Sequence, residues 1–351
     1  FGSNPSASSV FGNLLYTPIA VDLFGLPYEN PLDKGSVYYR PSNDIQHPIW
    51  TVKNSFTGQK INRIFGNMSV KYDIAKNMNI MYRVGYDQYG DYNYYSQNKG
   101  GTVGGNDFQL GFHRTVAGFN MIWDHSLLYN WQADLNSDWR LNVDAGLNSQ
   151  DRSYEQTGQR STQQLVYGLF DHDNFVIHDN NTEDGGRIDF KSRFLSLGAF
   201  AQGLLSYKEY LFFTVGGRNS WSSNLEKNNR SIFYPSFSAS FIPTSAIESL
   251  QNNNVLNYLK LRAGYSTSAN FGSPYNTRPI LSINTNTFVD RGANIYNSNS
   301  ISNRLPNPNL RPELLQEVEF GFEGKLFNNR MNVDFTYYNR YSKDQILSRD
   351  L

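Results

Sequence analysis

Residues 330–345 alternate between apolar and polar side chains, and this alternation most constrains what the chain can fold into. Up to position 341, odd positions are apolar or aromatic except for Asn339, namely Met331, Val333, Phe335, Tyr337 and Tyr341. Even positions are polar except for Tyr338, namely Arg330, Asn332, Asp334, Thr336, Arg340, Ser342 and Asp344. Because successive side chains of a β-strand point to opposite faces, the segment predicts a strand with one apolar and one polar face. The pattern alone leaves open whether the apolar face meets a protein core or lipid.

The same alternation recurs along the chain. It is regular at 62–74, 78–95, 139–150, 259–268 and 317–326, and less regular at 108–130, 193–207, 210–221 and 232–241. Together with 330–345 these segments predict an all-β fold of roughly ten antiparallel strands. Many are longer than the usual five or six residues of globular strands, whereas a tilted strand that crosses a membrane needs about 9 to 11.

The connections between these strands also differ in length in an orderly way. Short links lie at 75–77, 207–210 and 328–329, with links of intermediate length at 131–138 and 242–257. Long loops are expected at about 96–107, 151–192, 222–231 and 271–313. Transmembrane barrels place short turns at one end and long loops at the other.

Aromatic residues gather near the ends of the predicted strands. Trp131 and Trp139 flank one turn, and Tyr207 and Tyr210 flank another. Rings with one polar atom favour the headgroup level of a membrane. The central apolar positions carry no Lys or Arg, which at the bilayer midplane would cost about 2–4 kcal/mol each. We therefore predict a transmembrane antiparallel β-barrel rather than the alternative, a soluble β-sandwich or propeller.

The composition agrees with this prediction and excludes several classes of protein. The 351 residues contain 15% aromatic residues, no cysteine and no net charge, with a mean hydropathy of −0.56. Absence of Cys excludes disulfides, thiolate metal sites and Cys nucleophiles in this chain, and zero net charge argues against a nucleic-acid partner. No apolar run of about 18 residues or more marks a membrane helix.

Four stretches resemble the SusC/RagA family of TonB-dependent outer-membrane transporters of Bacteroidetes. They are "HPIWTVKNSFTGQKINRIFGNMSVKYDI" (47–74), "SIFYPSFSASF" (231–241), "LKLRAGYSTSAN" (259–270) and "LPNPNLRPELLQEVEFGFEGKLFNNRMNVDFTYYNR" (305–340). They occur in the order of the family and together cover most of residues 47–351.

The resemblance implies that residues 1–351 form the middle of a larger barrel of about 22 strands whose lumen is plugged. No plug domain or TonB box is found, and the family's last strands are missing, so we expect the chain to be part of a longer protein. The implied partners are outer-membrane lipid, a SusD-like surface lipoprotein, and the TonB complex acting through a plug outside this chain.

No catalytic motif is found. GxSxG, HExxH and Walker A patterns are absent, and the five His residues are scattered apart from His172 and His178. We therefore expect no enzyme activity and no cofactor. The acidic loop at 171–189 offers a weak calcium candidate, because Asp179, Asn181 and Glu183 have the spacing of oxygen ligands. Asp184 and Phe190 stand where a calcium loop needs Gly and Glu, so a solvated acidic loop is the preferred interpretation.

Substrate contacts are expected among lumen-facing charges and exposed loop aromatics. Most charges on the polar face should pair across strands or with a plug. The candidates are Trp221, Tyr92, Tyr94, Arg83, Arg140, Arg262 and Arg340.

Three functions remain open from the sequence. The leading hypothesis is active import of a nutrient, an oligosaccharide or a peptide, through the bacterial outer membrane. A second is a non-transporting structural partner in a larger outer-membrane assembly such as the type 9 secretion machinery. A third is a secreted, soluble, glycan-binding β-protein.

Overall fold

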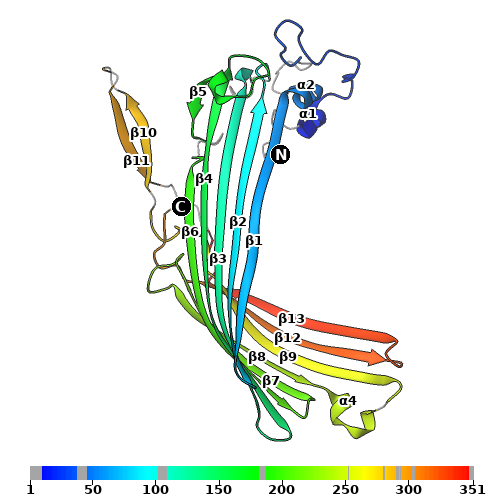
Figure 1. The fold of residues 1–351 in the computed structure, drawn as a ribbon. Helices are drawn as coiled ribbons and strands as arrows, with labels where there is room; N and C mark the ends of the chain where they lie inside the picture. Colours follow the sequence, from blue (N-terminus) through cyan, green and yellow to red (C-terminus); the bar gives the residue numbers. More distant parts are fainter. Residues whose placement is uncertain are drawn as a thin grey trace. The chain divides into compact units, whose positions relative to one another are not determined.

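The structure, a computed structural model, consists mainly of one large β-sheet (Figure 1). It describes residues 10–37, 46–101, 109–181, 187–251, 253–279, 281–289, 292, 294–301 and 305–347. The large sheet has 11 strands in the order β1-β2-β3-β4-β6-β7-β8-β9-β12-β13, with β5 paired to β4. Chain neighbours are therefore also sheet neighbours, apart from the steps around β5 and around the separate hairpin β10-β11.

Most strands follow the predicted ranges closely. The first half of the sheet contains β1 (Ser55–Ala75), β2 (Met78–Gln97), β3 (Phe112–Asp134), β4 (Trp139–Gln164), β5 (Phe175–Asp179) and β6 (Phe190–Tyr207). The second half contains β7 (Leu211–Ser222), β8 (Ser231–Phe241), β9 (Leu256–Asn270), β12 (Glu313–Leu326) and β13 (Met331–Lys343). The prediction of an all-β antiparallel fold with about ten strands is confirmed.

Short helices and one hairpin occupy the connections. The helices are α1 (Val10–Tyr16), α2 (Pro48–Asn54) and α4 (Pro243–Ala246), with 3₁₀ turns η1 (His172–Asn174) and η2 (Glu248–Leu250). The antiparallel hairpin of β10 (Leu281–Val289) and β11 (Ile295–Ile301) lies within the connection predicted as one long loop at 271–313.

The loop expected at 151–192 is shorter than predicted, because β4 continues to Gln164. Residues 151–164 carry polar side chains at nearly every position, so alternation of hydropathy cannot reveal the strand there. The connection that remains runs from 165 to 189 and contains η1 and β5.

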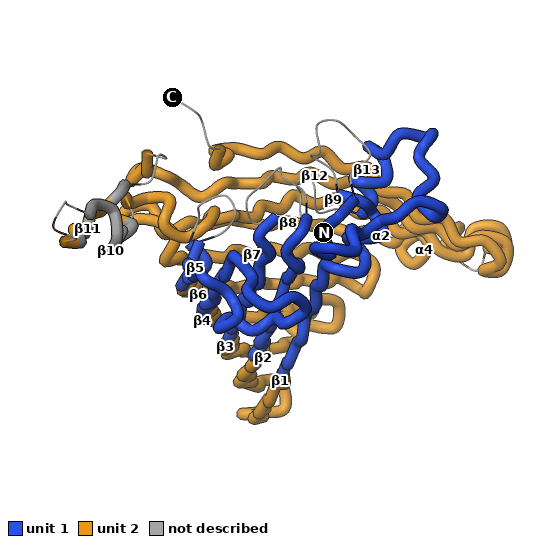
Figure 2. Tube along the Cα trace, turned by 90° about the horizontal axis from the view of Figure 1, so that it is seen from above, with its two compact units in different colours: residues 1–64, 87–121, 153–192 blue, residues 65–86, 122–152, 193–351 orange. Residues whose placement is uncertain are grey.

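The chain divides into two compact units, coloured separately in Figure 2. Unit 1 comprises residues 1–64, 87–121 and 153–192, and unit 2 comprises residues 65–86, 122–152 and 193–351. Four of the five buried hydrophobic side chains among the described residues belong to unit 1, namely Trp50, Phe112, Phe175 and Ile188. Leu225 is the fifth, so the described part of unit 2 has almost no apolar core.

Unit 1 is held together largely by buried amides. The Gln46 side chain donates to Thr51 Oγ1 at 2.7 Å and to Gln97 Oε1 at 3.1 Å, and both glutamines are fully buried. Asn98 donates to Asn54 Oδ1 at 3.1 Å, linking β2 to the end of α2. Since a buried amide without a partner costs about 1–3 kcal/mol, these hydrogen bonds fix the connections of unit 1 to its strands.

In unit 2, successive connections from β6 onward lie at alternate ends of the sheet. Residues 208–210 join β6 to β7, 242–255 join β8 to β9, and 327–330 join β12 to β13. Residues 223–230 and 271–312 form the other two connections. Because the strand pairs are antiparallel, the first three connections lie at one end of the sheet and the last two at the other.

Candidate functional site

The apolar face of the sheet in unit 2 is uncovered. In β12 and β13, Phe320 pairs with Tyr337 and Phe322 with Phe335. These four side chains are between 37% and 58% exposed, and Val318 is 39% exposed. No second layer of described residues packs over them, which a soluble sandwich would require. Large contiguous apolar surface of this kind marks contact with a membrane or a partner.

The opposite face of the same strands carries ion pairs. Arg262 of β9 donates to Asp334 Oδ1 of β13 at 2.8 Å, and its Nε lies 3.5 Å from Glu319 of β12. Arg340 pairs with Glu317 on the neighbouring strand. The predicted pairing of polar-face charges across strands is thus observed here, and Arg262 and Arg340 are both engaged by carboxylates of their own sheet.

On the polar face in unit 1, charged side chains also pair across neighbouring strands. Arg63 of β1 binds Asp87 of β2 through two hydrogen bonds of 2.9 and 2.7 Å. Arg83, in unit 2, differs: it is exposed and has no ion pair or side-chain hydrogen bond with any described residue. Of the four predicted arginines, Arg83 alone keeps its guanidinium available.

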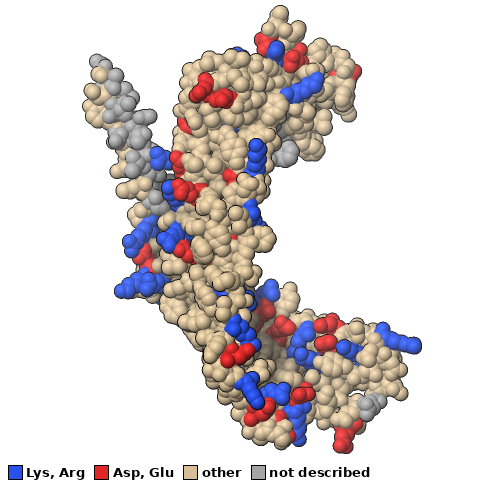
Figure 3. All heavy atoms as spheres, in the orientation of Figure 1, with Lys and Arg blue, Asp and Glu red and all other residues tan. Residues whose placement is uncertain are grey.

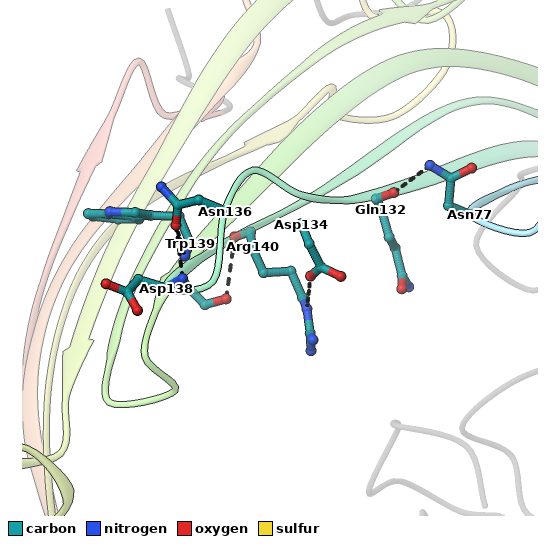
Figure 4. Close-up of polar contacts among 8 residues, drawn as sticks. Asn77, Gln132, Asp134, Asn136, Asp138, Trp139 and Arg140 are labelled. Carbon is teal, nitrogen blue, oxygen red and sulfur yellow. Dashed lines mark hydrogen bonds and ion pairs between the residues drawn. The ribbon is translucent and has the colours of Figure 1, made fainter.

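Arg140 lies at the short-turn end of the sheet, where Figure 4 shows the turns side by side. Its Nε donates to Asp134 Oδ1 at 2.7 Å. In the same region the Asn77 side chain donates to the Gln132 carbonyl at 2.9 Å, and Trp139 N–H donates to Asn136 Oδ1 at 2.9 Å. The ion pair of Arg140 with Asp134 therefore stabilises the turn between β3 and β4.

An aromatic cluster accompanies these turns. The ring centroids of Trp139 and Tyr207 are 4.6 Å apart, those of Tyr207 and Tyr210 are 5.5 Å apart, and those of Tyr210 and Phe241 are 6.2 Å apart. Three of the four aromatic positions predicted at these turns, Trp139, Tyr207 and Tyr210, thus form one contiguous group with Phe241, as a headgroup-level girdle would.

The predicted aromatic contact residues do not converge on a single site. Tyr92 of β2 is 42% exposed on the apolar parity of its strand. The ring of Tyr94 lies over Gly58, where a Cβ would come within 2.4 Å of it. Trp221 of β7 lines a cavity on the apolar face, together with Leu197 of β6. These positions speak against a shared substrate site, although their individual roles stay predictions.

The calcium candidate is only partly described. Asp179 Oδ2 lies 3.3 Å from the Arg160 guanidinium, and its Oδ1 accepts from the Asn181 backbone N–H at 2.9 Å. Glu183 lies outside the described residues. The described residues contain no group of three or more acidic, His or Cys side chains able to hold a metal ion.

Three histidines that look scattered in the sequence meet in unit 1. Ser161 Oγ lies 2.7 Å from His172 Nδ1 and 2.8 Å from His178 Nδ1. The His113 and His172 ring centroids are 4.5 Å apart. Burial, with a smaller effect of His178, lowers the pKa of His172. The sequence set only His172 and His178 apart from the scattered histidines, and the structure adds His113 to this pair.

A polar cavity of about 750 Å³ lies among the long connections of unit 2. At its wall, Arg278 donates to both carboxylate oxygens of Glu226, at 2.7 and 2.8 Å. This hydrogen-bonded guanidinium lowers the pKa of Glu226 to about 2. Asn229 and Pro306 are also part of the lining. No sequence pattern indicates this site, because its residues come from three separate segments of two connections, 223–230 and 271–312.

On the face of the molecule seen in Figure 3, acidic and basic side chains lie in mixed groups with broad uncharged areas between them. This mixed distribution agrees with a net charge of zero and with the many cross-strand pairs. Within the described residues, no helix is long and apolar enough to cross a membrane.

A sheet of long antiparallel strands with a bare apolar face and an ion-paired polar face defines the wall of a β-barrel. The sequence model of the family "TonB dependent receptor-like, beta-barrel" matches residues 15–351. The chain belongs to this family of outer-membrane barrels, which are transporters and receptors. The resemblance stated from the four motifs is thereby confirmed.

Known relatives agree with this assignment. TonB-dependent receptor P26 of Formosa agariphila is 25% identical over 229 residues, which are 64% of this chain and 22% of that protein. TonB-dependent receptor P3 of the same organism is 30% identical over 147 residues, 41% of this chain and 14% of that protein. The matched region is therefore less than a quarter of either relative.

The fold is also that of a solved transporter. The RagAB peptide transporter superposes with a TM-score of 0.74 at 18% identity, covering 89% of this chain and 33% of that one. The RagAB peptide importer in its closed-closed state gives a TM-score of 0.73. The chain thus corresponds to about a third of that structure.

Proposed function

We propose that this chain forms part of the barrel wall of an outer-membrane importer that takes up a nutrient, an oligosaccharide or a peptide. The importer would be powered by the TonB complex through a plug and would work with a SusD-like surface lipoprotein. Family membership supports the transport class, and the likeness to the RagAB peptide transporter supports a two-component importer.

The observation that carries the proposal is the contrast between the two faces of β9, β12 and β13. One face leaves Val318, Phe320 and Phe335 exposed, whereas the other sequesters Arg262 and Arg340 in ion pairs. Hydrocarbon tolerates the first face but not the second, because a charge in lipid near the midplane costs about 2–4 kcal/mol. The polar face suits water or a plug.

The cavity at the long connections is a reasonable place for the first contact with substrate. Glu226 and Arg278 neutralise each other there, which leaves Asn, Thr and Pro side chains as the remaining recognition surface. A neutral polar ligand fits such a lining, and both a glycan and an uncharged peptide segment meet that description.

Uptake by cells tests the proposal. Deletion of the gene should abolish growth on the transported oligosaccharide or peptide, and complementation should restore it. Deletion of the TonB component should give the same loss, because opening of the barrel depends on it. The proposal fails if the intact protein fractionates as a detergent-free soluble monomer. It also fails if deletion impairs protein secretion and leaves all uptake unchanged.

A further inference from the structure

A cavity of about 630 Å³ opens on the apolar face of unit 2. Its wall is made by side chains from β2, β3, β4, β6 and β7, with Arg230 at its edge. The side chains that matter for the argument are Tyr82, His125, Leu147, Leu197 and Trp221.

The lining residues form one row across neighbouring strands. Tyr82 OH lies 2.7 Å from His125 Nδ1, which joins β2 to β3 on this face. Leu197 of β6 is paired with Trp221 of β7. Tyr82 lies near the short-turn end of β2, whereas Arg230 directly precedes β8 at the end with long connections. The lining therefore reaches from Tyr82 on β2 to Arg230, at the end of the sheet where 223–230 join β7 to β8.

Arg230 is the unusual member of this lining. It is exposed, and within the described residues its guanidinium has no ion pair or hydrogen bond. Arg193, on a neighbouring part of the same face, instead binds Asp151 through hydrogen bonds of 3.0 and 2.5 Å. An arginine at the end of an apolar groove offers planar, two-point hydrogen bonding to a phosphate.

We propose that this groove binds one acyl chain of an anionic phospholipid, with the phosphate of its headgroup on Arg230. The inference rests on the proposed function, because it requires this face to meet a membrane. The apolar wall alone gives no selectivity, since a lipid tail is as apolar as a leucine. Selectivity for a negatively charged headgroup comes from Arg230, and Trp221 lies at the polar end where indole rings favour the interface.

The test measures which lipids stay on the protein. The intact protein is reconstituted in vesicles of equal parts phosphatidylglycerol and phosphatidylcholine with matched acyl chains, extracted in mild detergent, and weighed by native mass spectrometry. We expect phosphatidylglycerol to be retained about tenfold over phosphatidylcholine, because the trimethylammonium group of phosphatidylcholine offsets the phosphate charge near Arg230. Arg230→Gln should bring the ratio close to one, whereas the matched control Lys227→Gln, on the same connection but outside the lining, should keep it.

A second pair of variants tests the groove itself. Ala199→Trp fills the lining, and Ala201→Trp places the same ring two residues further along the same face of β6. We expect the first to reduce the retained lipid and the second to leave it unchanged. Equal retention in Ala199→Trp and wild type, or a wild-type ratio near one, overturns the inference and leaves the importer proposal intact. Failure of the protein to insert into vesicles overturns both.

Discussion

At the scale of single residues, the chain uses charge in two distinct ways. On the sheet, Arg262 and Arg340 are neutralised by carboxylates on the next strand. In the connections, Arg278 binds Glu226, which lies 52 residues earlier in the sequence. The first kind of pair was predictable, because strand alternation places both partners on one face. The pair in the connections was not predictable, because the residues around Glu226 give no indication that Arg278 lies beside it.

The Glu226–Arg278 pair predicts acid sensitivity of the connections it joins. The pKa of Glu226 falls from 4.5 to about 2 because Arg278 binds its ionised form. A carboxylate whose pKa is depressed stabilises the fold above the unfolded value, and this stabilisation is lost as pH falls from about 4.5 through about 2. Hydrogen exchange at residues 223–230 and 272–279 should therefore be slower in wild type than in Glu226→Gln at pH 6.

The difference should be largely lost only below about pH 2, where most of the wild-type carboxyl is protonated. Glu248→Gln serves as the matched control, because Glu248 is exposed in η2 and has no ion pair with a described residue. Equal exchange rates of wild type and Glu226→Gln at pH 6 would contradict the role assigned to this pair.

At the scale of elements, the strands were predictable where their two faces differ and not where both are polar. Residues 317–326 and 330–345 alternate with few exceptions, and they correspond to β12 and β13. Residues 151–164 are polar on both faces, so their sequence predicts a loop where the last part of β4 lies. Alternating hydropathy reveals a strand only where the two faces of the strand have different surroundings.

Close contacts between strands lead to a second prediction. A Cβ on Gly146 of β4 would lie 2.5 Å from the ring of Phe200 on β6, and 3.0 Å from the Leu127 carbonyl oxygen. Gly146→Ala should therefore lower the free energy of unfolding by about 1–3 kcal/mol, the usual cost of overpacking. The measurement is urea unfolding of the reconstituted protein.

Gly203→Ala is the matched control, because no heavy atom lies within 4 Å of the added Cβ on β6. We expect it to be neutral or to stabilise by up to about 1 kcal/mol, since alanine has less backbone freedom to lose. Similar losses in both variants would show that glycine is needed in these strands for a reason other than the Phe200 contact.

The histidine cluster of unit 1 leads to a third prediction. His172 is partly buried between Ser161, Thr115 and the ring of His113, and its pKa is lowered from 6.5. Burial is the main cause, and His178 adds to it. The carboxylates of Asp171 and Asp173 act in the opposite direction.

A histidine whose folded pKa is depressed stabilises the fold above the unfolded value, and this contribution is lost as pH falls below about 6.5. The protection factors of amides at residues 165–179, which correct for the slower intrinsic exchange at low pH, should fall between pH 7.5 and pH 5 in wild type. His172→Gln should reduce this pH dependence, with the buried His113 beside it accounting for the remainder, whereas His125→Gln in unit 2 should leave the pH dependence unchanged. Unchanged pH dependence in His172→Gln would contradict the assignment.

At the scale of the whole molecule, the sequence predicted the fold class and the family, while it missed the sites in the connections. Each of the roughly ten strands alternates because one face has apolar and the other polar surroundings. The pattern recurs often enough to identify the fold class even where single positions depart from it. The histidine cluster and the Glu226–Arg278 cavity each depend on contacts between segments that are distant in sequence, and no spacing rule encodes them. The specificity of a barrel of this family is therefore the part that only three-dimensional structure can supply.

The measurement that tests the two-faced sheet most directly is a spin-label scan along β12 of the intact, membrane-inserted protein. Labels are placed one at a time from Glu317 to Glu323, which the absence of cysteine in this chain makes straightforward. Collision with oxygen, which dissolves in lipid, is compared with collision with a water-soluble nickel complex. We predict oxygen to dominate at Val318, Phe320 and Phe322 and to fall at every position between them. A scan without this period of two, or with the nickel complex dominant at those three positions, would contradict the account.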